Sequence, residues 1–243
     1  MIPLGIMSFD LKLPLPPVTS GLVLDLQSRY GVELSGTEVI GWKDQSGYGN
    51  DLVVSGNSPY IENQFFGNQR AIRLTTGRGL VSQNPISGVT GSQAITLFVV
   101  TNFTQPPTGC ILVDYPDGGN GFTTYVQRPS STTQTVILSS GNSGLLVRQA
   151  DTTDNISTIY TYLMDYSTSP DTGLIYLNGS SASTQFINVV NNTDSFNGNY
   201  LSVVGAGGMT FHHGSVMMYN RALNENEIDS VTDFLKERYG IVY

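Results

Sequence analysis

The carboxylate side chains of this chain are poorly placed for hydrolytic chemistry. Retaining hydrolysis of a glycosidic bond needs two carboxyl groups about 5 Å apart on one face of a site. Glutamate occurs only at positions 33, 38, 62, 225, 227 and 237, so the strand-like segments between Glu62 and Glu225 contain none. Aspartates at positions 114, 117, 151, 154, 171 and 194 fall mostly in expected turns, where Asp is common. We therefore expect no enzyme and keep a glycosidase as a minor alternative.

The histidines and the cysteine offer no second kind of catalytic centre. His212 and His213 are the only histidines, and neighbours on a strand point to opposite faces, so they cannot hold one metal ion together. No G-x-S-x-G motif marks a nucleophilic serine. The single cysteine, Cys110, lies in an apolar run that favours a small core side chain. We expect both histidines to be hydrogen-bonded structural residues.

Hard oxygen ligands are concentrated in the stretch from Asp114 to Asn120, which also contains Asp117. Calcium prefers carboxylate and amide oxygens of this kind. The spacing differs from that of an EF-hand, and turn formation alone explains the same residues. We therefore expect no cofactor, and a calcium site at Asp114, Asp117 and Asn120 is the lesser alternative.

A dense turn sequence follows the only tryptophan, Trp42, and runs from Asp44 to Asp51. Aromatic side chains among polar turn residues can form a sugar site, in which Asp and Asn bind the hydroxyl groups. A tryptophan beside a glycine-rich turn can instead anchor the loop against the core, and we favour this interpretation for Trp42. The candidate ligand-binding residues are Trp42, Asp44, Tyr48, Asn50 and Tyr60.

Short apolar segments separated by turn residues predict an antiparallel sandwich. The segment 94–103 has apolar residues at both odd and even positions, so we expect a central strand that is covered on both faces. Asn178 and Gly179 predict a two-residue hairpin turn. Further strands are expected at 22–26, 39–43, 71–74, 79–81, 110–115, 122–128, 134–139, 144–149, 158–166, 173–177, 182–187, 200–205 and 210–219.

The chain contains one clear helix signal, close to its end. Asn224 is a suitable N-cap, Glu227 completes a capping box, and Gly240 suits the left-handed position after the last turn. The apolar residues between them follow three-and-four spacing. These features predict an amphipathic helix at 225–239 that packs across the sandwich, on the second face of the strand 94–103.

The first twenty residues carry large apolar side chains between prolines, which predicts an extended N-terminal arm over residues 1–20. Alternation of apolar and polar positions indicates that one side of the arm is buried, either on its own sandwich or on a neighbouring subunit. The remaining residues, 21–243, are expected to form one domain. The residues expected to contact other subunits are Ile2, Leu4, Ile6, Phe9, Leu11, Leu13 and Leu15.

Charge and hydropathy exclude two classes of partner. The net charge of −8 and the pI near 4.5 argue against nucleic acid, which needs Lys and Arg to neutralise phosphates. The N-terminus lacks the basic region of a signal peptide. No apolar run reaches the roughly 20 residues that a membrane helix needs, so we expect no membrane partner.

Four separated motifs point to one family. The stretch from Trp42 to Asp51 looks like a W-x-D-x-S-G-x-G-N motif, and residues 95–100 look like a central strand. Residues 174–179 look like an L-x-x-Y-x-N-G hairpin, and residues 211–227 look like an F-x-G … Y-N-R-A-L ending. Together they resemble the concanavalin A-like lectin and glucanase superfamily, in its laminin G-like jelly-roll branch, over about residues 21–240. The resemblance implies an all-β, antiparallel jelly-roll β-sandwich with one C-terminal helix.

The resemblance is less specific for function than for fold, because this fold serves lectins, glycosidases, adhesion modules and viral structural parts. Glucanases of the superfamily carry two Glu flanking an Asp on a strand, and this chain has no such pair there. Many chains of this type without a signal peptide look like bacteriophage virion proteins.

We therefore predict a structural component of a tailed-phage virion, attached to capsid or tail through the arm. Capsid decoration is slightly favoured because the chain has no fibre shaft. Other virion proteins and copies of the same chain, as a homo-oligomer, are the expected partners. The alternative is a glycan-binding, lectin-like module.

Overall fold

The apolar segment from 94 to 103 is the strand on which the fold is built. A computed structural model describes residues 15–103, 109–116, 121–127, 134–140, 146–151, 156–169, 171–181, 185–188, 195–205 and 210–242. The segment forms β8 (Ala94–Phe103), and all of its residues are buried. It pairs antiparallel with β13 (Thr158–Asp165) on one edge and with β18 (Phe211–Tyr219) on the other. The prediction of a central strand covered on both faces is confirmed.

The sheet that contains β8 is one layer of a sandwich. The second edge of β18 is shared by two strands: β6 (Gln69–Leu74) pairs with its first residues and β1 (Leu22–Gln27) with its last. On the other side, β14 (Thr172–Leu177) follows β13, and the short β15 (Ser180–Ser181) follows β14. We call β1, β6, β18, β8, β13 and β14 the helix-covered layer.

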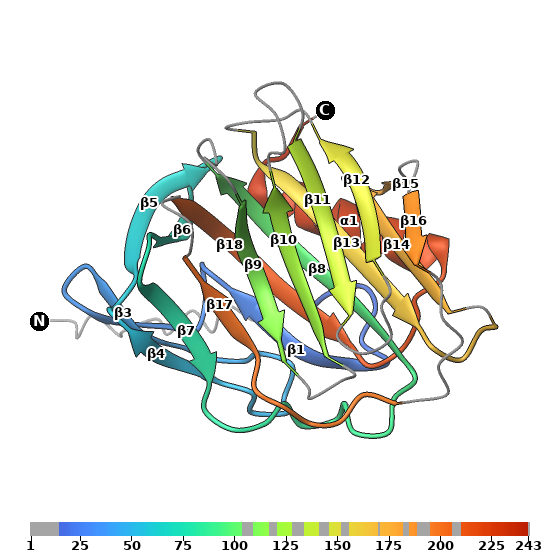
Figure 1. The fold of residues 1–243 in the computed structure, drawn as a ribbon. Coiled ribbons are helices and arrows are strands. Elements are labelled where there is room, and N and C mark those ends of the chain that lie inside the picture. Colours follow the sequence, from blue (N-terminus) through green and yellow to red (C-terminus); the bar gives the residue numbers. More distant parts are fainter. Residues whose placement is uncertain are drawn as a thin grey trace, which may run out of the picture.

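The second layer lies across the first, and its strands β9 to β12 lie in front of β8 and β13 in Figure 1. In spatial order it contains β4 (Leu52–Gly56), β7 (Arg78–Ser82), β17 (Ser202–Val204), β9 (Gly109–Tyr115), β10 (Phe122–Gln127), β11 (Gln134–Ser140), β12 (Leu146–Asp151) and β16 (Gln185–Asn188). The two layers are joined at one side by β2 (Val32–Ser35), β3 (Glu38–Trp42) and β5 (Tyr60–Phe66).

Two hydrophobic cores lie on the two faces of β8. Leu97 and Val99 point into the main core between the layers. Phe98 and Val100 point the other way, into a core that the helix α1 (Glu225–Tyr239) closes. Figure 1 shows α1 behind β13 and β14. The protein is thus an all-β jelly-roll sandwich with one C-terminal helix, as predicted. The buried helix residues are Ile228, Val231, Thr232, Leu235 and Tyr239.

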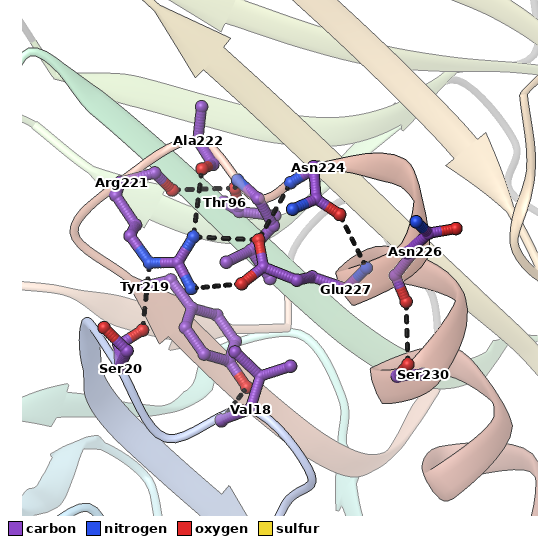
Figure 2. A network of polar contacts seen from close by, with 11 residues as sticks. Val18, Ser20, Thr96, Tyr219, Arg221, Ala222, Asn224, Asn226, Glu227 and Ser230 are labelled. Carbon is purple, nitrogen blue, oxygen red and sulfur yellow. Dashed lines mark hydrogen bonds and ion pairs between the residues drawn. The ribbon is translucent and has the colours of Figure 1, made fainter.

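The helix begins and ends at the predicted residues. The Asn224 side chain accepts a hydrogen bond from the Glu227 N–H, and the Glu227 carboxylate accepts one from the Asn224 N–H, so the capping box is complete. Gly240 has a φ of 61°, the left-handed conformation expected after the last turn. Figure 2 shows how Arg221, at the end of the last strand, also binds the capping carboxylate.

Four strands were not predicted: β2 and β5 where the two layers join, β4 at the edge of the second layer, and the two-residue β15, which lies just before the predicted return strand 182–187. In β5 the pairing with β6 shifts register between Glu62 and Phe66, and Gln64 has a positive φ of 59°. This irregularity breaks the period-two pattern by which a strand is recognised. The hairpin turn after β14 is confirmed, because Asn178 and Gly179 have φ of 54° and 85°.

The predicted arm falls mostly outside the described residues. Six of its seven proposed contact residues, Ile2, Leu4, Ile6, Phe9, Leu11 and Leu13, belong to that part. Leu15 is described and is 69% exposed. Further along, the Val18 carbonyl accepts a hydrogen bond of 2.9 Å from the Tyr219 hydroxyl, which fastens the chain to the sandwich. Among the described residues, no helix is long and apolar enough to cross a membrane.

Candidate functional site

The turn after Trp42 is built around one carboxylate, that of Asp44. Its Oδ1 accepts hydrogen bonds of 2.9 Å from the N–H groups of Asp25 and Ser46. Its Oδ2 accepts bonds of 2.7 Å from the Ser46 hydroxyl and 3.0 Å from the Asn50 N–H. Four donors occupy the carboxylate, so Asp44 shapes the turn. This corrects the prediction that its oxygens bind a ligand.

Asn50 fastens the same turn to the connection between β7 and β8. Its side chain is buried, at 4% exposure. The amide nitrogen donates to the carbonyls of Val23 and Ser87, at 2.7 and 3.2 Å, and the amide oxygen accepts from the Ser87 N–H at 2.8 Å. An amide that bridges three backbone groups is a structural residue. The prediction of Asn50 as a ligand-binding residue is therefore wrong.

Trp42 is a core residue with no exposed surface. It belongs to the main core cluster, which confirms the interpretation that it anchors the turn. A buried ring cannot stack on a sugar, so the alternative proposed for Trp42 is wrong.

Tyr48, at the tip of the turn, is the one predicted site residue that is freely presented. It is 48% exposed. One edge of its ring lies against Gly88, where an added Cβ would come within 2.6 Å of Tyr48 Cε1. Gly88 also has a φ of 82°, so both the backbone and the ring require glycine there.

A second exposed tyrosine, Tyr200, lies just before β17 and is 46% exposed. Tyr48 and Tyr200 are the two aromatic residues that are exposed among the described residues. Tyr200 was predicted as the first residue of a strand, but the strand begins at Ser202. The preceding Asn197-Gly198-Asn199 is a turn signal that could have indicated an exposed tyrosine.

The two tyrosines lie on loops that are hydrogen-bonded to opposite edges of one segment, residues 82–87. The N–H groups of Gln83 and Ser87 donate to residues 51 and 50 on the Tyr48 side, at 2.9 and 2.8 Å. The N–H groups of Ser82 and Ile86 donate to residues 201 and 199 on the Tyr200 side, both at 2.8 Å. In Figure 1 the connection after β7 and the segment before β17 run together along the lower edge.

We call this surface the tyrosine rim: Tyr48, Tyr200 and the exposed residues Gln83, Asn84 and Ser87 between them. It combines two aromatic side chains with amide and hydroxyl groups on a backbone held from both edges. Rigid tyrosines beside adaptable polar groups are typical of surfaces that bind ligands without covalent chemistry.

Tyr60 does not belong to the tyrosine rim. It pairs with Glu38 at the first residue of β3, whereas the turn of Asp44 follows the last residue of that strand. The Arg78 guanidinium lies 4.1 Å from the centre of the Tyr60 ring and donates to its hydroxyl at 2.8 Å. The ring face is thus occupied by a cation, and Tyr60 is a structural partner of Arg78.

The proposed calcium site is described only at Asp114. Its carboxylate accepts a hydrogen bond of 2.6 Å from the Thr123 hydroxyl across the β9–β10 pair. Asp117, Asn120 and the Cys110 side chain lie outside the described residues. Within the described ranges, no cluster of three or more His, Cys, Asp or Glu side chains could hold a metal ion.

The histidines on β18 have different environments. His212 Nε2 lies 2.9 Å from Glu62 Oε2, and its ring stacks on Phe65 with centroids 3.9 Å apart. His213 is fully buried, and neither ring nitrogen has a hydrogen-bond partner among the described residues. Burial lowers the pKa of His213 to about 3. The expectation of hydrogen-bonded histidines is confirmed for His212 and wrong for His213.

Comparison with protein-family models and with curated protein sequences finds no match. Solved structures do resemble this fold. The binding domain of botulinum neurotoxin DC, solved with rat synaptotagmin II, matches with a TM-score of 0.65 and 14% identity over 90% of this chain and 52% of that chain. The same domain solved with SialylT matches with a TM-score of 0.63 and 13% identity, over 89% and 52% of the two chains.

A structure described as "Cell entry of botulinum neurotoxin type C is dependent upon interaction with two ganglioside molecules" has a TM-score of 0.63 and 13% identity, over 90% of this chain and 52% of that chain. This chain thus spans about half the length of the solved chains that it matches. At such low identity the likeness establishes the jelly-roll fold.

Proposed function

We propose that this chain is a non-enzymatic recognition domain that binds a glycan at the tyrosine rim. The observation that carries the proposal is that two exposed tyrosines, Tyr48 and Tyr200, lie on loops that are hydrogen-bonded to opposite edges of the segment 82–87. Exposed aromatic side chains are costly in water, and a rigid backbone lowers the entropy lost when a ligand binds. Both features suit a surface that receives a sugar ring.

The likeness to receptor-binding domains supports this function over the virion role predicted from the sequence. The matching structures are described as binding domains, and their descriptions name SialylT and ganglioside molecules as ligands of those proteins. For this chain, the likeness gives a precedent for a jelly-roll fold within a domain that binds receptors.

The tyrosine rim also indicates what kind of binding to expect. Its named side chains are neutral near pH 7, so hydrogen bonds and ring contacts would supply the affinity. Binding at this surface should therefore depend little on salt, because screening acts on charged pairs.

A glycan array followed by calorimetry on the best ligand tests the proposal. We expect binding to fall at least about tenfold in Tyr48→Ala and in Tyr200→Ala, because each removes a central aromatic contact. The matched control is Ile40→Ala, which removes an apolar side chain that is 47% exposed on β3. All variants should keep the wild-type melting temperature. Equal affinity of the tyrosine variants and the control would overturn the rim assignment.

The virion role remains a prediction that rests on the N-terminal arm. Deleting residues 1–14 should abolish co-sedimentation with particles and leave the melting temperature of the sandwich unchanged. Retained co-sedimentation would refute a role of the arm in attachment.

A further inference from the structure

A separate cavity of about 280 Å³ opens at the far end of β1 from the tyrosine rim. It lies where the last turns of α1 meet the residues that follow β1 and the start of β6. Its volume suits one acidic group and the sugar ring that carries it, rather than a long ligand. The described residues that line it are Arg29, Gln69, Phe234, Glu237 and Arg238.

The guanidinium of Arg238 is held in place from two sides. Its central carbon lies 4.2 Å from the centre of the Phe234 ring, one helical turn earlier, and Nη1 donates to Gln27 Oε1. Burial lowers the pKa of Arg238, yet a guanidinium remains charged at any working pH. The cavity therefore contains a cation whose orientation is set before any ligand arrives.

The second cation is Arg29, an exposed residue that also lines the cavity. The charge of Arg29 contributes to lowering the pKa of Arg238, so the two guanidinium groups are close enough to repel each other. Glu237 is the one carboxylate among the described lining residues. Among the described lining residues, two guanidinium groups against one carboxylate give the lining a net positive charge on a chain whose net charge is −8, and the Asp25 carboxylate, which also acts on Arg238, lies behind that lining.

Behind the cavity, Gln27 is itself fixed by a buried carboxylate. Its Nε2 donates to both oxygens of Asp25, at 2.9 and 2.7 Å, so its Oε1 is the atom that faces Arg238. Asp25 is 2% exposed. The chain of contacts from Asp25 through Gln27 to Arg238 supports the guanidinium as the scaffold of a binding site would.

From this geometry we propose that the cavity between Arg29 and Arg238 binds the acidic group of a single acidic sugar unit, a carboxylate or a sulfate. An anion between the two guanidinium groups would relieve their repulsion and accept directed hydrogen bonds from both. The Gln69 amide, which also lines the cavity, offers both a donor and an acceptor to a ring hydroxyl. The choice of a sugar as the carrier rests on the proposed function, whereas the anion site does not.

The inference is tested by adding one ligand at a time to the full chain and following binding by NMR. The ligands are N-acetylneuraminic acid, glucose 6-sulfate, inorganic sulfate and neutral glucose. Both acidic sugars should bind, neutral glucose should not, and inorganic sulfate should bind more weakly than the sugar sulfate. Affinity should fall as NaCl is raised, because the contact is between charges. Sulfate that binds as well as glucose 6-sulfate would overturn the sugar as carrier.

Because Arg29 is exposed, it can be substituted without disturbing the core. Arg29→Gln should weaken both acidic sugars by about tenfold or more, as expected for the loss of one charge-assisted contact. The matched control is Arg70→Gln, an exposed arginine outside the described lining, which should bind as the wild type does. Glu237→Gln should tighten binding because it removes the lining carboxylate. Equal binding by Arg29→Gln and Arg70→Gln would refute the site.

The proposal for the tyrosine rim and the inference for this cavity can be tested independently of each other. The double variant Tyr48→Ala/Tyr200→Ala should lose the array ligand and keep the acidic sugars. If that variant loses the acidic sugars as well, they bind at the tyrosine rim and the cavity inference is overturned. If it keeps the array ligand, the proposed function at the tyrosine rim is wrong and the cavity inference stands.

Discussion

Arg221 binds both carboxylate oxygens of Glu227, with Nη1 at 2.9 Å from Oε2 and Nη2 at 2.7 Å from Oε1. Glu227 Oε2 also accepts the Asn224 N–H, so one carboxylate caps the helix and ties it to the end of β18 (Figure 2). The hydrogen bond to Arg221 is the main reason that the pKa of Glu227 is lowered to about 2. The residues that end the last strand and start the helix thus act as one unit.

Removing the arginine should loosen this junction. We expect Arg221→Ala to lower the free energy of unfolding by about 1 kcal/mol, because it removes a two-bond ion pair and a 3.0 Å contact to the Ser20 carbonyl. Glu227→Gln keeps a residue that can complete the capping box and should cost less. Lys236→Ala is the control, since its 3.5 Å pair with Asp233 is exposed. Urea unfolding measures all three; equal values for Arg221→Ala and Lys236→Ala would contradict the role given to Arg221.

Gly214 is predicted to be intolerant of any side chain. A Cβ there would lie 2.8 Å from Tyr239 Cε1 and 3.0 Å from Val100 Cγ1, in the core under the helix. Gly214→Ala should cost about 1–3 kcal/mol, as overpacking of a core does. The cost should shrink in a Tyr239→Leu background, where the ring is absent, and unfolding of the four proteins in that cycle measures the coupling. An unchanged cost would show that the ring is not the obstacle.

The parts of the fold that were predictable are those with strong local signals. Asn224, Glu227 and Gly240 mark the helix through hydrogen bonds within a few residues of each other, and these bonds form as predicted. The strand 94–103 was evident because both of its faces are apolar. β5 was missed because the positive φ of Gln64 interrupts its alternation, and its pairing depends on residues distant in the sequence.

The candidate site was less predictable, because the residue types in the turn suit two roles. Asp44 and Asn50 have the side chains of a sugar site, yet the nearest donors and acceptors are backbone groups of their own chain. Which partner an Asp or Asn finds depends on packing that the sequence does not specify. Tyr200 was missed because it was assigned to a strand that begins only at Ser202, although the turn residues before it indicated a loop.

The buried Asn50 should therefore matter for stability. Asn50→Ala leaves the N–H and carbonyl of Ser87 and the carbonyl of Val23 without this partner, so we expect a loss of about 2–4 kcal/mol. The control is Asn226→Ala, an exposed asparagine on the helix, which should stay within about 0.5 kcal/mol of the wild type. Faster hydrogen exchange at the Ser87 amide would confirm that the turn loosens, whereas unchanged exchange and stability would contradict the bridging role.

Protonation of His213 should favour the unfolded chain at acidic pH. Its folded pKa is lowered to about 3 by burial, while the unfolded chain takes up the proton near pH 6.5. The contribution to stability is therefore complete above about pH 6.5 and is lost as the pH falls toward 3, by up to about 1.4 kcal/mol per pH unit. His213→Phe, which cannot be protonated, should remove this loss. Parallel pH profiles of the unfolding free energy for the two proteins would contradict the assignment.

Asp25 should produce the opposite dependence, because burial raises its folded pKa to about 6 from an ordinary value of 3.8. Its contribution to stability is complete below the unfolded pKa and is lost as the pH rises through about 6, by up to about 3 kcal/mol in all. Between pH 4 and 6 the effects of Asp25 and His213 oppose each other, so their combined effect on the wild-type profile should be nearly flat there. Asp25→Asn should then become less stable on acidification, and His213→Phe more stable. Chemical unfolding at pH 4, 5, 6 and 7.5 measures how the unfolding free energy of each variant changes with pH. If this free energy stays constant in both variants, neither group titrates as its burial requires.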